Sequence, residues 1–172
     1  MGLFYVIGGS FLMTKDEKKL KFVFLSDDFY KDYDTNTYKE ILKKDSRPYV
    51  MFIIKIDNID YAVPFRTNIN HKFAYFTNPP KKCGIDYKKA IVVTKSNYLD
   101  ESKYVLVNQR EYINIRENED VIIKEFKDYL KKYKKAIKKL SVKRNYEICK
   151  FSSLEYFHKE MGIEDVILEP TL

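Results

Sequence analysis

The sequence predicts an α+β fold in which helices pack on a compact, strongly curved antiparallel β-sheet. Three observations lead to this prediction. Two β-rich segments, 49–56 and 59–65, flank the turn residues Asp57 and Asn58, which indicates a hairpin. A long segment, 119–140, carries apolar residues at helical spacing. The chain of 172 residues suits one domain with its own core, so we expect a single domain over 1–172.

The composition excludes several classes of protein. The chain has only 5 Gly and 5 Pro and is 16% aromatic, which argues against collagenous and disordered chains. No apolar run approaches the roughly 18 residues of a membrane helix. The two cysteines, Cys83 and Cys149, lack the spacing of a zinc site. The net charge of +7 suits an anionic partner such as nucleic acid.

Residues 1–14 are apolar and uncharged. A secretory signal begins with basic residues, so this segment is better explained as an N-terminal strand or an upstream extension. Residues 1–19 are therefore a candidate extension of the domain. The expected compartment is the cytoplasm, where both cysteines are reduced thiols.

Short elements are expected around the hairpin. Alternation predicts a strand over 20–25, and the polar segment 26–34 predicts a turn or short helix that presents Tyr30 and Tyr33. Because Pro64 has no N–H for a central strand, the second hairpin strand is expected to end near it or lie at an edge.

Three further strands and a second helix complete the expected fold. The strands are predicted at 90–93, 104–107 and 112–115. A capping box, Ser152 with Glu155 three residues later, predicts a helix from 152 to 161 that Gly162 ends. Asn118 is the expected N-cap of the long helix. The apolar stripe of that helix consists of Ile122, Phe126, Tyr129, Leu130, Tyr133, Ile137 and Leu140.

The segment 66–72, Arg-Thr-Asn-Ile-Asn-His-Lys, directly follows a strand end and collects several reactive groups. Loops at strand ends commonly carry functional residues. Arg66 and Lys72 could neutralise phosphate oxygens, Thr67 could hydrogen-bond a phosphate or an attacking hydroxyl, and His71 could transfer a proton. The alternative is an ordinary polar loop in which Thr67 caps a turn. Neither His71 nor His158 has a partner at ligand spacing, so no metal or cofactor is expected.

Two basic clusters could bind RNA. From Asn118 to Arg144 the chain has ten basic and four acidic residues, most of its surplus charge. A solvated helix face is the usual explanation of such a run, and a phosphate-binding ridge is the functional one. A second cluster interleaves lysines with aromatic residues, which can stack on unpaired bases. Its members are Tyr75, Phe76, Lys81, Lys82, Tyr87, Lys88 and Lys89.

Three segments together resemble a known family: RPYVMFIIKIDNIDYAVPFRTNINH, GIDYKKAIVV and CKFSSLEYFHKEMG. They are similar to the endoribonuclease toxins of type III toxin–antitoxin systems, the ToxN/AbiQ superfamily with its CptN and TenpN groups. The resemblance covers about Leu20 to Met161. It implies a barrel-like sheet similar to the Kid/MazF toxin fold. It also implies metal-independent cleavage of mRNA and of a repeat precursor RNA, which leaves a 2′,3′-cyclic phosphate and a 5′-hydroxyl.

The resemblance also implies partners and site residues. The partner is an RNA antitoxin of pseudoknot repeats, which holds the toxin inactive in a closed hetero-oligomer without requiring a toxin–toxin dimer. The biological roles are plasmid maintenance or abortive infection against phage. Thr67 takes the place of the essential hydroxyl and Arg66 that of the cation, although no Lys follows directly as it does in ToxN-like members. His71 matches a frequent His, and Tyr30 matches an early Tyr.

The predicted site therefore has a catalytic and an RNA-binding part. The catalytic residues are Thr67, Arg66, His71, Asn70 and Tyr30. The RNA-binding residues are Tyr33, Arg47, Asn68, Lys72, Tyr75, Lys81, Lys82, Tyr87, Lys88, Lys89, Lys131, Lys132 and Lys135. The main alternative function is a non-catalytic RNA-binding regulatory module. A DNA-binding domain is less well supported, because the long helix has no helix-turn-helix partner.

Overall fold

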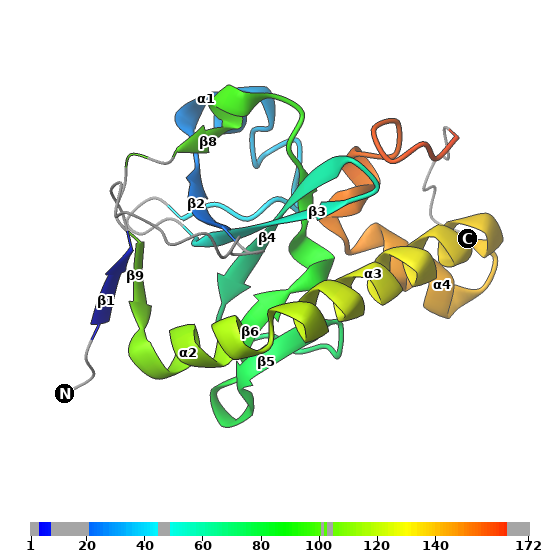
Figure 1. Ribbon diagram of the computed structural model, residues 1–172. Coiled ribbons are helices and arrows are strands. Elements are labelled where there is room, and N and C mark those ends of the chain that lie inside the picture. The colour runs from blue at the N-terminus through cyan, green and yellow to red at the C-terminus, as the bar shows by residue number, and fades with distance from the viewer. Residues whose placement is uncertain (1–3, 8–20, 45–48, 101, 103–104, 165–172) are drawn as a thin grey trace.

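The computed structural model describes residues 4–7, 21–44, 49–100, 102 and 105–164 (Figure 1). Its main element is a seven-stranded sheet in which every pairing is antiparallel. The path runs β5-β6-β4-β3-β2-β8, and β7 pairs with β4 beside it. The strands are β2 (Lys21–Leu25), β3 (Met51–Ile56), β4 (Ile59–Arg66), β5 (Ala74–Asn78), β6 (Cys83–Asp86), β7 (Ile91–Val92) and β8 (Leu99–Asp100).

This architecture confirms the predicted α+β class with an antiparallel sheet. The expected barrel is wrong, because β5 and β8, the two ends of the path, do not pair with each other in the described part of the chain. A separate two-stranded ribbon joins β1 (Phe4–Ile7) to β9 (Val105–Asn108). Of the two explanations given for the N-terminal segment, the structure shows a strand at residues 4–7.

The hairpin between β3 and β4 is formed as expected. Asp57 and Asn58 have φ of 51° and 63°, the left-handed conformation that a two-residue type I′ turn requires at both positions. The register pairs Ile56 with Ile59 across the turn. Residues on β3 and β4 such as Phe52 and Val63 are completely buried. The turn and the apolar faces therefore specify the same register.

Of the two alternatives expected at Pro64, the strand end is the one observed: β4 ends at Arg66, two residues later, whereas β4 is a central strand and not an edge. On one side Pro64 lies opposite Met51, and the N–H of the next residue, Phe65, donates to the Val50 carbonyl at 2.8 Å. On the other side β4 pairs with β7 at 61–62 and with β6 at 65–66. Pro64 falls between these two partners, where no N–H is needed.

Four helices flank the sheet: α1 (Asp27–Asp32), α2 (Gln109–Glu117), α3 (Glu119–Ala136) and α4 (Lys143–Lys150). The long predicted helix and the short one after β2 are confirmed. The strand expected at 112–115 is wrong, since these residues lie inside α2. The Asn118 side chain does not cap α3 but donates to the Asn114 carbonyl at 2.7 Å. The capping box expected at Ser152 is not formed: the Ser152 hydroxyl accepts from the Leu154 N–H at 3.4 Å, and Glu155 contacts Lys150 instead of the Ser152 N–H. The helix expected over 152–161 is only a 3-10 turn, Ser153–Tyr156.

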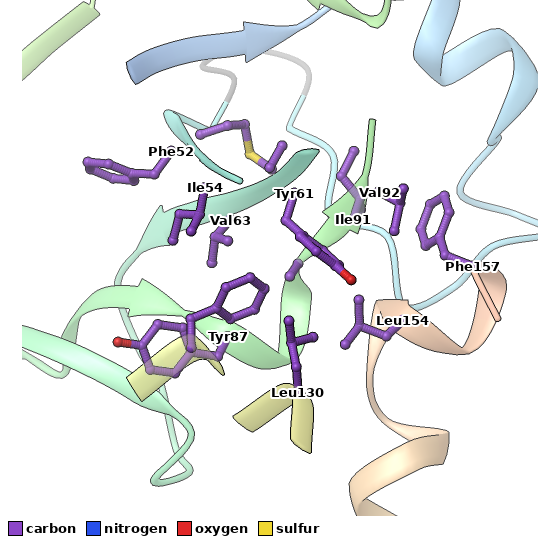
Figure 2. Packing of buried hydrophobic residues seen from close by; sticks show 14 of the residues in the cluster. Phe52, Ile54, Tyr61, Val63, Tyr87, Ile91, Val92, Leu130, Leu154 and Phe157 are labelled. Atoms are coloured by element: carbon purple, nitrogen blue, oxygen red, sulfur yellow. The ribbon is translucent and has the colours of Figure 1, made fainter. Parts of the chain in front are cut away.

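The core lies between α3, the sheet and the C-terminal turn. The buried side of α3 presents Ile122, Phe126, Tyr129, Leu130 and Tyr133. Figure 2 shows Tyr61 of β4 and Ile91 and Val92 of β7 beside Leu154 and Phe157, with Leu130 of α3 directed at the same cluster and Phe52 and Ile54 of β3 on its other side. Because α3 is fixed on the sheet in this way, its lysines have defined positions. No helix in the described part of the chain is long and apolar enough to span a bilayer.

Replacing Gly84 with Ala is expected to destabilise the fold by about 2 kcal/mol, as overpacking does. A Cβ at this position in β6 would lie 2.0 Å from the Tyr75 carbonyl oxygen of β5, a backbone atom that cannot move alone. Urea unfolding of the variant against wild type measures the loss. The control is Ala90→Gly, because Ala90 is also buried. Gly162→Ala is not a suitable control, because the left-handed φ of +64° at Gly162 strains any other residue. A Gly84→Ala variant as stable as wild type would contradict the close approach of the strands.

Candidate functional site

The loop after β4 has a fixed conformation. Ile69 is only 2% exposed, and its N–H donates to the Lys82 carbonyl at 3.0 Å, which ties the loop to the turn between β5 and β6. Asn68 has φ of 59°, a left-handed conformation that Asn tolerates better than most residues. Thr67, Asn68, Asn70 and Lys72 are exposed around the buried Ile69. The sequence thus folds this loop as an anchored platform for polar groups.

A buried carboxylate joins the two ends of this loop. Asp86, the last residue of β6, has no exposed surface. Its Oδ2 lies 3.3 Å from Arg66 Nη1, and its Oδ1 lies 3.2 Å from His71 Nε2 and accepts from the Lys88 N–H at 3.1 Å. A carboxylate out of contact with water needs such partners. Arg66 and His71, both predicted as catalytic, are therefore brought together by an acid that the sequence-based prediction did not include.

The contacts with Asp86 define what the two side chains can do. Arg66 is about one-fifth exposed (21%), and its Nε donates to the Thr67 carbonyl at 3.3 Å. The guanidinium is thus oriented while part of it faces solvent. His71 is also partly exposed, but its Nδ1 is enclosed and has no hydrogen-bond partner among the described residues. Because Nε2 faces Asp86, Nδ1 is the nitrogen left for proton transfer.

Asn70 and Lys82 form a polar contact at the outer side of the loop. Lys82 Nζ donates to Asn70 Oδ1 at 2.8 Å. Lys82 itself has a left-handed φ of 49° at the end of the 3-10 turn Pro79–Lys81. Both residues are exposed, as is Lys81 in the same turn. Lys81 and Lys82 stay predictions for RNA contact, and Asn70 stays a predicted catalytic residue.

Tyr30 is not brought to this site. It lies on α1, where its hydroxyl donates to the Leu42 carbonyl at 3.1 Å, and burial raises its pKa to about 12. In Figure 1, α1 lies at the opposite end of the molecule from β5 and β6. The assignment of Tyr30 to the catalytic group is therefore wrong in this structure, because the chain carries β2 to the other end of the sheet.

Tyr33 packs against other aromatic side chains away from the loop 66–72. Its ring packs against four aromatic rings with centroid distances of 5.0 to 6.1 Å, and it is only partly exposed. These rings belong to Phe29, Tyr38, Tyr98 and Phe157. Tyr33 thus joins α1 to the C-terminal turn rather than offering a free face to a base. Arg47 lies outside the described residues.

The second basic-aromatic cluster is mostly structural. Tyr87 is 2% exposed, and its hydroxyl donates to the Ile122 carbonyl and to Glu125 Oε2 at 3.3 and 3.1 Å, so its ring is not available for base stacking. Tyr75 is partly buried and donates to Asn114 Oδ1 at 2.8 Å. The prediction that Tyr87 binds RNA is wrong, because the aromatic ring of Tyr87 points into the core.

The two lysines that follow Tyr87 are also engaged. Lys89 forms an ion pair with Glu40 in which both side chains are largely buried. Lys88 Nζ lies 3.5 Å from the Glu147 carbonyl and over the Phe151 ring. Burial lowers the pKa of Lys88, and the positive charge of Lys89 adds to this effect. Lys88 thus contacts α4 and Lys89 contacts the segment before β3, so neither ammonium is a free phosphate ligand.

Helix α3 meets the loop through Phe73. The Phe73 ring packs on Tyr129 of α3 with centroids 5.4 Å apart, and Lys132 Nζ lies 5.0 Å from the Phe73 centroid. Lys131 and Lys135 are exposed on the same helix, and Lys131 faces Asp128 at 3.7 Å. Of the three predicted α3 lysines, Lys132 is the one that the structure places beside the loop.

No family model, curated protein or solved structure matches the chain. The family resemblance therefore stands on the three sequence segments alone. The geometry adds two side chains to the site, Asp86 and Phe73. No local sequence pattern marks Asp86 as a partner of the loop, because strand pairing brings it there.

Proposed function

We propose that this protein is a metal-independent endoribonuclease toxin of a type III toxin–antitoxin system. The proposal rests on one observation: Arg66 and His71, at the two ends of the anchored loop, both contact the buried Asp86. A cation held at a fixed place and an imidazole oriented by a carboxylate suit phosphate-ester cleavage. The proposal includes a relationship to the Kid/MazF toxin fold, with an open sheet in place of a barrel.

The proposed reaction uses the RNA 2′-hydroxyl as the nucleophile. Its oxygen attacks the adjacent phosphorus, its proton passes to a base, and the 5′-oxygen leaves with a proton, which gives a 2′,3′-cyclic phosphate. Arg66 neutralises the non-bridging oxygens as charge builds on them. Thr67 holds the phosphate or the 2′-hydroxyl, and Asn70 supports it. His71 transfers protons through Nδ1, which requires the loop to shift so that this nitrogen is uncovered.

The proposed partners are RNA molecules in the cytoplasm. The substrates are mRNA and the precursor of a repeat RNA antitoxin. The processed pseudoknot RNA then inhibits the toxin within a closed toxin–RNA assembly that needs no toxin–toxin contact. The exposed side chains of Lys131 and Lys135 on α3 support this part of the proposal, since phosphate contacts provide most of the affinity of such complexes.

Cleavage in the presence of a chelator tests the proposed activity. We expect the purified chain to cut RNA in EDTA, to leave 2′,3′-cyclic phosphate and 5′-hydroxyl ends, and to spare DNA and 2′-O-methyl RNA. Thr67→Ala is expected to lower the rate by about a hundredfold, whereas Thr67→Ser retains the hydroxyl and most of the rate. Cleavage that a chelator abolishes, or products with 3′-hydroxyl ends, would contradict the proposal.

A non-catalytic RNA-binding module is the second candidate. The enclosed Nδ1 of His71 favours this candidate, because a nitrogen out of reach of substrate cannot transfer a proton. The contacts of Arg66 and His71 with Asp86 would then only hold the loop in place. Expression of wild type and Thr67→Ala in the same host separates the two functions. Equal toxicity, or none from either chain, would favour the binding module.

A further inference from the structure

The Phe73 ring lies between the loop 66–72 and the middle of α3. Lys132 Nζ is 5.0 Å from its centroid and Lys72 Nζ is 6.0 Å from it. The His71 ring lies 6.3 Å away between centroids, and Tyr129 supports Phe73 from the core at 5.4 Å. Phe73 is partly exposed. One aromatic ring thus has two ammonium groups over it and the proposed catalytic imidazole beside it.

Two positive charges, those of Lys72 and Lys132, lie beside the Phe73 ring. The pKa of Lys132 is below its usual value because of burial and because Arg144 and Lys72 repel its charge. Within the part of the chain that the structure describes, neither Lys72 nor Lys132 forms an ion pair, whereas Lys131, one residue away, faces Asp128. A bound anion would relieve this repulsion, and its charge-assisted hydrogen bonds would be strong.

We propose that Lys72 and Lys132 bind a backbone phosphate of single-stranded RNA, with the Phe73 ring under the sugar or base of that nucleotide. The inference rests on the proposed function, because the strand would be the RNA substrate that passes the loop of Arg66 and His71. An unpaired strand is required, since a duplex would not lay a single nucleotide against an aromatic ring. The site uses side chains from the loop and from α3.

Binding of a non-cleavable RNA tests the subsite directly. The probe is a fluorescein-labelled 2′-O-methyl heptamer of mixed sequence, titrated with the full chain at several salt concentrations. We expect Lys132→Gln and Lys72→Gln each to weaken binding by about fivefold. The double variant is expected to reduce the slope of log K against log salt by about 0.7, the value for one phosphate contact in a single strand. Phe73→Leu is expected to weaken binding by about tenfold, the lower part of the range for loss of an aromatic platform.

Lys127→Gln is the matched control, because Lys127 is an exposed lysine of α3 away from Phe73. Its affinity and salt slope are expected to equal those of wild type. Circular dichroism of each variant shows whether it is folded. The subsite is overturned if Lys132→Gln and Lys72→Gln bind like Lys127→Gln, even if the wild type cuts RNA. If the wild type cuts no RNA but the two variants lose affinity and the double variant loses slope, the cleavage proposal fails and the phosphate subsite stands.

Discussion

Replacing Asp86 with Ala is expected to lower the free energy of unfolding by about 3 kcal/mol, the lower end of the range for a broken buried ion pair. The lower end applies because Arg66 and His71 are 21% and 27% exposed, so water can solvate them once the carboxylate is gone. The variant also loses the acceptor for the Lys88 N–H. Urea unfolding monitored by circular dichroism measures the loss, and RNA cleavage is expected to disappear with it.

Two further variants separate charge from packing. Asp86→Asn keeps the volume and an acceptor for Lys88, so we expect a smaller loss of stability but still a strong loss of cleavage. Asp60→Ala is the matched control, because Asp60 is a partly exposed acid of β4 that faces Lys55 at 3.6 Å. An exposed pair of this kind contributes under about 1 kcal/mol. Equal stability of Asp86→Ala and Asp60→Ala would contradict an anchoring role for Asp86.

Elements with a local signal could be predicted from the sequence. The hairpin depends on Asp57 and Asn58 and on the apolar runs beside them, and each part of this signal lies within 20 residues. Helix α3 likewise carries its apolar stripe within its own length. In both cases the periodicity selects the buried face before any tertiary contact is known.

Elements that depend on distant neighbours were missed. The segment 112–115 is a short apolar run, and such a run does not distinguish a strand from a helix; inside α2 it buries Ile115 in the core. Helix α4 lacks a side-chain cap at its N-terminus, so no local motif marked it. Pro64 is tolerated because two different strands pair with β4 on either side of it, which the sequence does not reveal.

The candidate site likewise has a part that the sequence predicts and a part that it does not. The loop 66–72 stands out in the sequence because its polar groups are contiguous. Asp86 reaches this loop only through the register that pairs Arg66 with Gly84 and Ala74 with Asp86. Phe73 and Lys132 meet because α3 crosses the end of the same loop. Contacts of this kind depend on strand pairing and helix packing, so composition and spacing could not predict them.

Replacing Arg66 with Gln is expected to lower the rate of RNA cleavage by at least about a hundredfold, as loss of one stabiliser of transition-state charge does. Arg66→Lys keeps a positive charge, but one ammonium cannot face both Asp86 and a phosphate as a guanidinium can, so we expect about a tenfold loss. Single-turnover cleavage at saturating enzyme measures both rates. Lys55→Gln, which removes an exposed cation of β3, is the control and should cut at the wild-type rate.

The double variant Arg66→Gln with Asp86→Asn shows whether the two residues act as one unit. If Asp86 acts by holding Arg66, then the second substitution removes little that the first has left, and the two rate losses are far from additive. If the losses multiply instead, Asp86 affects cleavage by another route, with His71 as the remaining partner. An Arg66→Gln variant that cuts as fast as Lys55→Gln would mean that the contact with Asp86 only stabilises the loop, and the binding module would then be the better explanation of this site.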